Sequence, residues 1–73
     1  MPEDQNGDIL RGVSRIAPFL QALLGEPDLS EKKVYDWIYR GKIPGGKVGA
    51  DVVASKEALR RYYARAAAGL TAN

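Results

Sequence analysis

The chain of 73 residues has 11 basic and 9 acidic side chains, a net charge of +2, and neither cysteine nor histidine. It can form one domain at most, too small for a buried multi-substrate active site, and the missing thiols and imidazoles exclude disulfides, zinc clusters and Cys or His catalysis. We therefore expect no catalytic residue, metal or cofactor, and the lack of a signal peptide or of a run of about 20 apolar residues predicts a cytoplasmic protein with no membrane partner.

The N-terminal segment, residues 1–8, is predicted to be a flexible acidic tail, because no apolar residue after Met1 offsets the entropic cost of ordering it. Ser14 is then expected to cap a helix that extends to Leu24. Pro18 lacks an amide proton and fits only the first turn of a helix, so this helix is expected to begin near Ser14 or later. Its apolar stripe would comprise Ile16, Phe19, Leu20, Leu23 and Leu24.

A Gly-Glu-Pro-Asp sequence at residues 25–28 predicts a break. Ser30 follows as the cap of a second helix over residues 31–40, which the Gly-Lys-Ile-Pro sequence at 41–44 ends. At 100° per residue, one face of this helix is apolar and the opposite face is charged. The apolar face consists of Val34, Trp37 and Ile38.

Glycines and valines between residues 45 and 53 predict a two-stranded hairpin, since glycine allows tight turns and valine favours strands. Ser55 would cap a third helix, and residues 67–73 are expected to fray. The apolar side of that helix would comprise Ala58, Leu59, Tyr62, Tyr63 and Ala66. The predicted fold is one domain over residues 9–66, mainly α, with three helices and a small hairpin.

The basic residues are concentrated in the second half of the chain. From Arg40 to Asn73, seven basic side chains stand against two acidic ones. A field of this sign favours a polyanionic partner, although many mildly basic domains bind no nucleic acid. A basic helix that leads directly into a Gly- and Lys-bearing hairpin is typical of winged helix-turn-helix domains on duplex DNA.

We therefore expect residues 31–40 to lie in the major groove and the hairpin at 45–53 to contact the DNA backbone. Lysine and arginine would contact phosphates and base edges, and Tyr39 would donate a hydrogen bond to phosphate. The candidate DNA-binding residues are Lys32, Lys33, Asp36, Tyr39, Arg40, Lys42 and Lys47.

Plainer interpretations stay open for several of these residues. Asp36 has possible i, i+4 ion pairs with Lys32 and Arg40, and such exposed pairs are common on helices that bind nothing. Lys47 is equally consistent with a solubilising turn residue. A carboxylate at Asp36 would be repelled by DNA phosphates unless it accepts from cytosine or orients Arg40 or Lys32.

Two other nucleic-acid or nucleotide patterns are weaker. Residues 41–47 match the first seven positions of a P-loop, but Val48 replaces the Mg²⁺-binding Ser or Thr, and a helix instead of a strand precedes the loop. The aromatic residues would suit base stacking on single strands, but Trp37 and Tyr62 fall on apolar stripes that favour the core.

The segments at residues 16–20, 30–38 and 41–44 resemble the excisionase and MerR-like family of small winged helix-turn-helix DNA-binding domains, common in phages and mobile elements. The shared features are an Ile-Ala-x-x-Leu helix, a Ser-capped helix with Val-Tyr-x-x-Ile, and a Gly-x-Ile-Pro exit. A hairpin and a capped Ala-Leu helix ending at Leu59 complete the similarity. Two departures are a longer connection at residues 21–29 and a hairpin with Asp51 but no arginine.

The resemblance implies a recognition-helix surface, backbone contacts from Lys42 and Lys47, and packing by Val34 and Ile38. It also implies a nucleoid-associated transcriptional regulator or excision accessory factor. The residues of the implied recognition surface are Glu31, Lys32, Lys33, Asp36 and Arg40.

A chain of this size reads only a few base pairs, so we expect a dimer or a head-to-tail array on double-stranded DNA. The alternative is a DNA-recognition or protein-interaction module of a phage packaging complex, like a small terminase, or of a recombination complex. In that case Tyr35, Tyr39 and the apolar C-terminal segment would contact a packaging protein or a recombinase.

Overall fold

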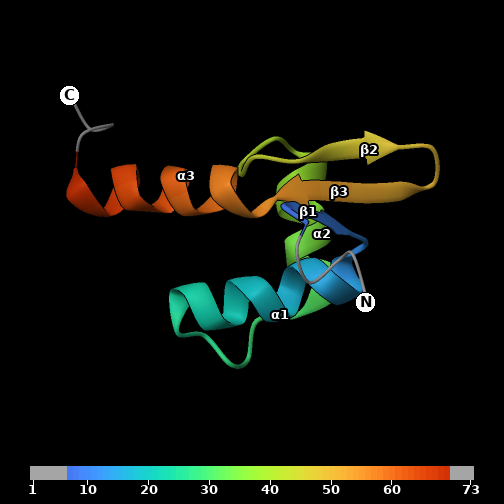
Figure 1. Ribbon diagram of the computed structural model, residues 1–73. Coiled ribbons are helices and arrows are strands. Elements are labelled where there is room, and N and C mark those ends of the chain that lie inside the picture. Colours follow the sequence, from blue (N-terminus) through green and yellow to red (C-terminus); the bar gives the residue numbers. More distant parts are fainter. Residues whose placement is uncertain (1–6, 70–73) are drawn as a thin grey trace.

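The computed structural model describes residues 7–69, which form three helices and a small antiparallel sheet (Figure 1). The strand order is β1-β3-β2. Of the predicted tails, 1–8 and 67–73, residues 1–6 and 70–73 lie outside the described part of the chain, whereas Ala67 and Ala68 belong to the third helix. The elements are β1 (Ile9–Arg11), α1 (Val13–Leu24), α2 (Glu31–Tyr39), β2 (Gly46–Val48), β3 (Asp51–Ser55) and α3 (Lys56–Ala68).

The sheet has one strand more than the predicted hairpin, so the fold is mixed α/β. Strand β1 pairs antiparallel with β3, with Ile9 opposite Ser55 and Arg11 opposite Val53. Three residues are too few to show an alternating pattern in the sequence. The strand forms because Leu10, which is only 8% exposed, enters the core while its two neighbours stay outside.

Helix α1 begins earlier than predicted. Its N-cap is Gly12, which has a φ of 89° and makes no side-chain cap, so the expected cap at Ser14 was wrong. The backbone amide of Gly12 donates to the Val52 carbonyl at 2.7 Å, and this bond to β3 fixes where the chain turns from β1 into α1. Pro18 is therefore the sixth helical residue instead of a first-turn residue. Ser14 and Pro18 are both exposed, so the carbonyl that loses its amide donor faces solvent.

The long connection between α1 and α2 is held to α1. The Gln21 side chain donates from Nε2 to the Leu29 carbonyl at 2.8 Å, and the Glu26 amide donates to the Gln21 carbonyl at 2.9 Å. Leu29 itself is buried. These contacts return the chain to the core before α2 starts, although the connection exceeds a tight turn.

One core joins the three helices and the sheet. Its fully buried members are Ile16, Leu20, Val34 and Leu59. Trp37, Phe19 and Tyr63 pack against it from partly buried positions, whereas Tyr62, which we expected on the apolar side of α3, is exposed. Leu59 is the one buried residue of α3, and the rest of that helix leads away from the sheet (Figure 1). Among residues 7–69, no helix combines the length and apolar content that crossing a membrane requires.

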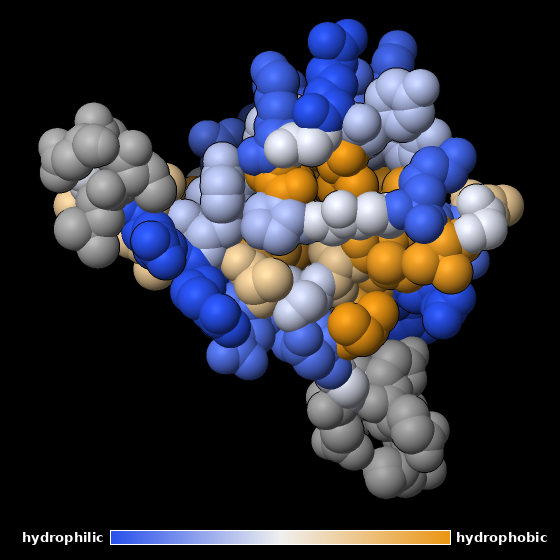
Figure 2. Space-filling model, turned by 90° about the horizontal axis from the view of Figure 1, so that it is seen from above, coloured by the Kyte–Doolittle hydropathy of each residue, from blue (hydrophilic) through white to orange (hydrophobic). Residues whose placement is uncertain are grey.

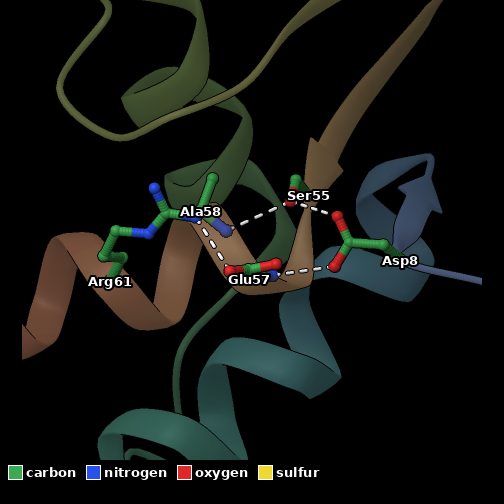
Figure 3. A network of polar contacts seen from close by, with 5 residues as sticks. All are labelled: Asp8, Ser55, Glu57, Ala58 and Arg61. Atoms are coloured by element: carbon green, nitrogen blue, oxygen red, sulfur yellow. Dashed lines mark hydrogen bonds and ion pairs between the residues drawn. The ribbon is translucent and has the colours of Figure 1, made fainter.

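The start of α3 is tied to the segment before β1 by a polar network (Figure 3). Ser55 caps the helix as predicted, because its Oγ accepts from the Ala58 amide at 3.1 Å. The same hydroxyl donates to Asp8, whose other carboxylate oxygen accepts from the Glu57 amide at 2.9 Å. Asp8, which we assigned to the tail, thus satisfies an N-terminal amide of a helix 49 residues along the chain.

The link between α2 and β2 is closely packed at Gly45. A Cβ added there would lie 3.0 Å from the Val53 carbonyl oxygen and 3.2 Å from a side-chain carbon of Ile38. Ile38 and Ile43 are buried on either side of the link. Only a residue without a side chain therefore lets α2 approach the sheet this closely.

We predict that Gly45→Ala destabilises the fold by about 1–3 kcal/mol, because the added methyl must displace backbone or a core side chain. Gly46→Ala is the matched control, since nothing lies within 4 Å of its Cβ position. It should change the free energy of unfolding by less than about 0.5 kcal/mol. Urea denaturation of both variants measures the difference, and equal midpoints would refute the close packing.

Hydrogen bonds from Ser55 and from the Glu57 amide lower the pKa of the Asp8 carboxyl below its ordinary value. A carboxyl with a depressed folded pKa stabilises the fold above its unfolded pKa, and this stabilisation is lost as the pH falls through the folded pKa. We expect wild type to exceed Asp8→Asn in urea midpoint at pH 7, and the gap to close below about pH 4. Asp28→Asn, in the exposed α1–α2 connection, is the control. A gap that stays constant down to pH 2 would contradict the role of the Asp8 charge.

Candidate nucleic-acid interface

Helix α2 presents one face to the core and leaves the other open. Ser30 caps it as predicted, accepting from the Lys33 amide at 3.1 Å, and Glu31 stands in the first turn, where the helix dipole favours an acid. Val34 and Ile38 are buried and fix the rotation of the helix. The remaining side chains are exposed or half-buried, and they include Lys32, Asp36, Tyr39 and Arg40.

Asp36 and Arg40 form an ion pair in the middle of this open face. Nε of Arg40 donates to Oδ1 of Asp36 at 2.8 Å. This hydrogen bond, together with the negative charge of Asp36, raises the pKa of the Arg40 guanidinium. Lys32, the other potential partner of Asp36, forms no ion pair within residues 7–69.

Two aromatic contacts mark the flanks of the open face. The rings of Tyr35 and Tyr39 stack with centroids 6.1 Å apart and planes inclined by 14°. Lys33 lies on nearly the opposite side of the helix from Tyr35, and its Nζ is 5.9 Å from the centre of the Trp37 ring. Lys33 therefore covers the flank opposite Tyr35, where a cation–π contact holds it to Trp37.

The segment after α2 leads to the hairpin by a fixed path. Gly41 has a φ of 73°, which a glycine adopts without strain. The Lys42 amide donates to the Trp37 carbonyl at 2.8 Å, and Ile43 is buried. The Lys42 side chain is exposed beside this path.

Lys47 lies on the same side of the sheet as the helices. It is directly opposite Val52 in the β2–β3 ladder, and residues directly opposite each other share a face of the sheet. Val52 is buried among the core residues, so Lys47 points to the helix side, although it is itself exposed at the sheet edge. The two-residue turn that follows β2 uses Gly49, with a φ of 65°.

A cleft joins α2 to the hairpin turn. It has a volume of about 250 Å³, and Tyr35 lines it together with Ala50 at the hairpin turn and Ser14 near the start of α1. This position of Tyr35 was not predicted from the sequence. Its spacing of four residues from Tyr39 was the available clue, because side chains at i and i+4 share a helix face.

The stretch from α2 to the hairpin turn carries a net positive charge. Between residues 30 and 49, five basic side chains stand against two acidic ones, a net charge of +3. The outer face of the sheet instead carries Ile9 and Val48, both more than half exposed, and a long ion pair of 3.9 Å between Arg11 and Asp51. In Figure 2, strongly hydrophilic side chains project along the upper edge of the view, apart from the apolar surface in its centre.

A second surface is the apolar groove between the C-terminal half of α1 and α3. Its volume is about 570 Å³, and its walls include Leu23, Leu24 and Tyr63. Among residues 7–69, Arg60 is its one charged lining residue, and the guanidinium carbon lies 5.3 Å from the centre of the Phe19 ring. The sequence showed the apolar residues of both helices but not that α3 would stand away from α1.

Of the seven predicted DNA-binding residues, Lys32, Asp36, Tyr39 and Arg40 lie on the open face of α2, Lys33 lies on its Trp37 flank, and Lys42 and Lys47 are exposed on the segment that leads into and through the hairpin. Within residues 7–69, no three acidic side chains gather closely enough to hold a metal ion. No family model, curated protein or solved structure matches this chain.

Proposed function

We propose that this protein is a sequence-specific duplex DNA-binding protein of the winged helix-turn-helix type. In this proposal α1 and α2 form the helix-turn-helix unit and β2–β3 the wing. The observation that carries it is the placement of Lys47 on the helix side of the sheet, joined to the open face of α2 through buried Ile43 and closely packed Gly45. In this proposal a single ligand contacts both elements without a rearrangement of the chain.

The dimensions of α2 suit the major groove. Nine residues give a helix about 13 Å long, and a helix with its side chains fits a groove roughly 12 Å wide. The open face would enter the groove, with Lys32 and Arg40 as its cations and the exposed Tyr39 hydroxyl as a donor to phosphate. Val34 and Ile38 would hold the opposite face on the protein core.

The wing would contact the DNA backbone beside the groove. Lys42 and Lys47 supply ammonium groups that no carboxylate neutralises within residues 7–69. Each phosphate contact of this kind releases counterions and strengthens binding without reading sequence. Lys33 would contribute less than we expected from the sequence, because it lies over Trp37 on the far flank.

One copy of so small a domain would read only a few base pairs. Sequence-specific binding would therefore involve two copies, as a dimer or as a head-to-tail array on adjacent sites. We propose a cytoplasmic, nucleoid-associated role as a transcriptional regulator or as an excisionase-like accessory factor in recombination.

We predict that the double variant Lys32→Gln/Lys47→Gln binds duplex DNA more weakly and lowers the slope of log affinity against log salt concentration by about two, one for each lost phosphate contact. Both side chains are exposed, so the thermal midpoint should hardly change. Fluorescence anisotropy with a duplex of mixed sequence, at several salt concentrations, measures both affinity and slope.

Arg65→Gln, which removes one positive charge, is the control for this experiment. Arg65 is exposed on α3, which leads away from the sheet (Figure 1), and its loss should leave the salt slope nearly unchanged. The proposal fails if the wild-type chain binds no duplex in gel shift, or if its binding is insensitive to salt. It also fails if Arg65→Gln lowers the slope as much as one of the two lysine changes.

The α1–α3 groove favours a second candidate function, a protein-interaction module of a phage packaging or recombination complex. Its partner would be an apolar helix with a carboxylate placed opposite Arg60, the one charged residue of the groove. Leu23→Glu would abolish such an interaction and leave duplex binding intact. Pull-down with a candidate packaging protein or recombinase, in parallel with gel shift, separates the two functions.

A further inference from the structure

We propose that Arg40 reads guanine in the major groove and that Asp36 is the positioning residue that presents it. This inference deepens the proposed function and rests on it. Asp36 is a carboxylate on a surface that would face phosphates, so its charge alone would oppose DNA binding. The inference gives this residue a role in presenting Arg40.

The geometry of the ion pair leaves the reading end of Arg40 available. Asp36 accepts from Nε, so the two terminal nitrogens of the guanidinium are not used by this bond. The Arg40 side chain is 63% exposed and that of Asp36 is 50% exposed, so the pair stands at the surface. Because long side chains on a helix point back toward its N-terminus, the guanidinium lies beside Asp36, near the middle of the open face, although Arg40 follows the last helical residue.

The chemistry of the bases then selects one of them. Guanine presents two neighbouring acceptors in the major groove, O6 and N7, which match two parallel N–H donors of a guanidinium. Adenine offers a donor at N6 in place of one acceptor, so it meets the same arginine with an N–H against an N–H. A guanidinium held by its Nε has lost rotational freedom before binding, which favours this two-bond contact over a general attraction to phosphates.

The pair is close to neutral, which separates its role from that of the lysines. Lys32, Lys42 and Lys47 would supply affinity through phosphates, whereas Asp36 offsets the charge of Arg40. Removal of the Asp36 charge should therefore release Arg40 toward phosphates. Affinity for unrelated sequences would rise while selectivity for guanine falls, and a purely structural role of Asp36 would not produce this opposite pair of changes.

The test begins with the wild-type chain and a random pool of duplexes, from which bound sequences are selected. We expect a required guanine in the recovered site. A probe with 7-deazaguanine at that position lacks the N7 acceptor and should bind about tenfold more weakly than the parent duplex. The affinities of Asp36→Asn and Arg40→Ala for both probes, and for an unrelated duplex, are then compared with those of wild type.

Both variants should show less than twofold difference between the two probes, and Asp36→Asn should bind the unrelated duplex more tightly than wild type does. Arg65→Gln is the control, because it removes a cation from α3, outside the proposed interface, and should keep the wild-type discrimination. Circular dichroism and the thermal midpoint verify that each variant folds.

The outcomes separate this inference from the function on which it rests. If wild type binds duplexes with the salt dependence described above but recovers no required guanine, the guanine inference is overturned and DNA binding stands. If Asp36→Asn keeps full discrimination while Arg40→Ala loses it, the positioning role of Asp36 is overturned. If no duplex is bound at all, the proposed function itself fails.

Discussion

The contact of Ile38 with the Gly45 backbone is the constraint on which the arrangement of this molecule depends. Ile38 belongs to α2 and Gly45 precedes β2, and the space between them admits no Cβ. A larger residue at this point would separate the helix from the sheet. This close approach therefore contributes to fixing the position of α2 against the start of the hairpin.

A second set of contacts fixes the N-terminal part of the domain to the rest. Strand β1 is short, but it is held by the ladder with β3, by the Gly12 amide on the Val52 carbonyl, and by Asp8 at the start of α3. These bonds connect residues 40 or more positions apart in the chain. They place the N-terminus of α1 beside the hairpin, so the two sides of the cleft belong to one rigid body of small size. A core of this size gives the folded state only a small free energy of unfolding. Each polar contact is therefore a larger share of the total stability than it would be in a larger domain.

Much of the fold was predictable from local sequence, and the reasons for the failures are physical. The caps at Ser30 and Ser55 were confirmed, because a hydroxyl before a helical pattern acts on amides three residues away. The cap at Ser14 was wrong because the start of α1 is fixed by a hydrogen bond to β3, which no local pattern encodes. Strand β1 was missed for the same reason, since its pairing partner is distant in sequence.

At the candidate site, helical periodicity indicated the open face of α2. The side of the sheet on which Lys47 lies, however, depends on the ladder register, and whether Asp36 pairs with Lys32 or with Arg40 depends on rotamers.

The shortness of the outer strands has a consequence for the protein in concentrated solution. Strands β1 and β2 form the two edges of the sheet, and each is only three residues long. An unpaired edge is a template on which another chain can add by backbone hydrogen bonding, and long flat edges make proteins aggregate. Here each edge strand offers few free amide and carbonyl groups, and each carries one charged residue, Arg11 on β1 and Lys47 on β2. The short edge strands therefore protect the domain against fibril-like stacking, and no additional element is needed to cover the sheet edges.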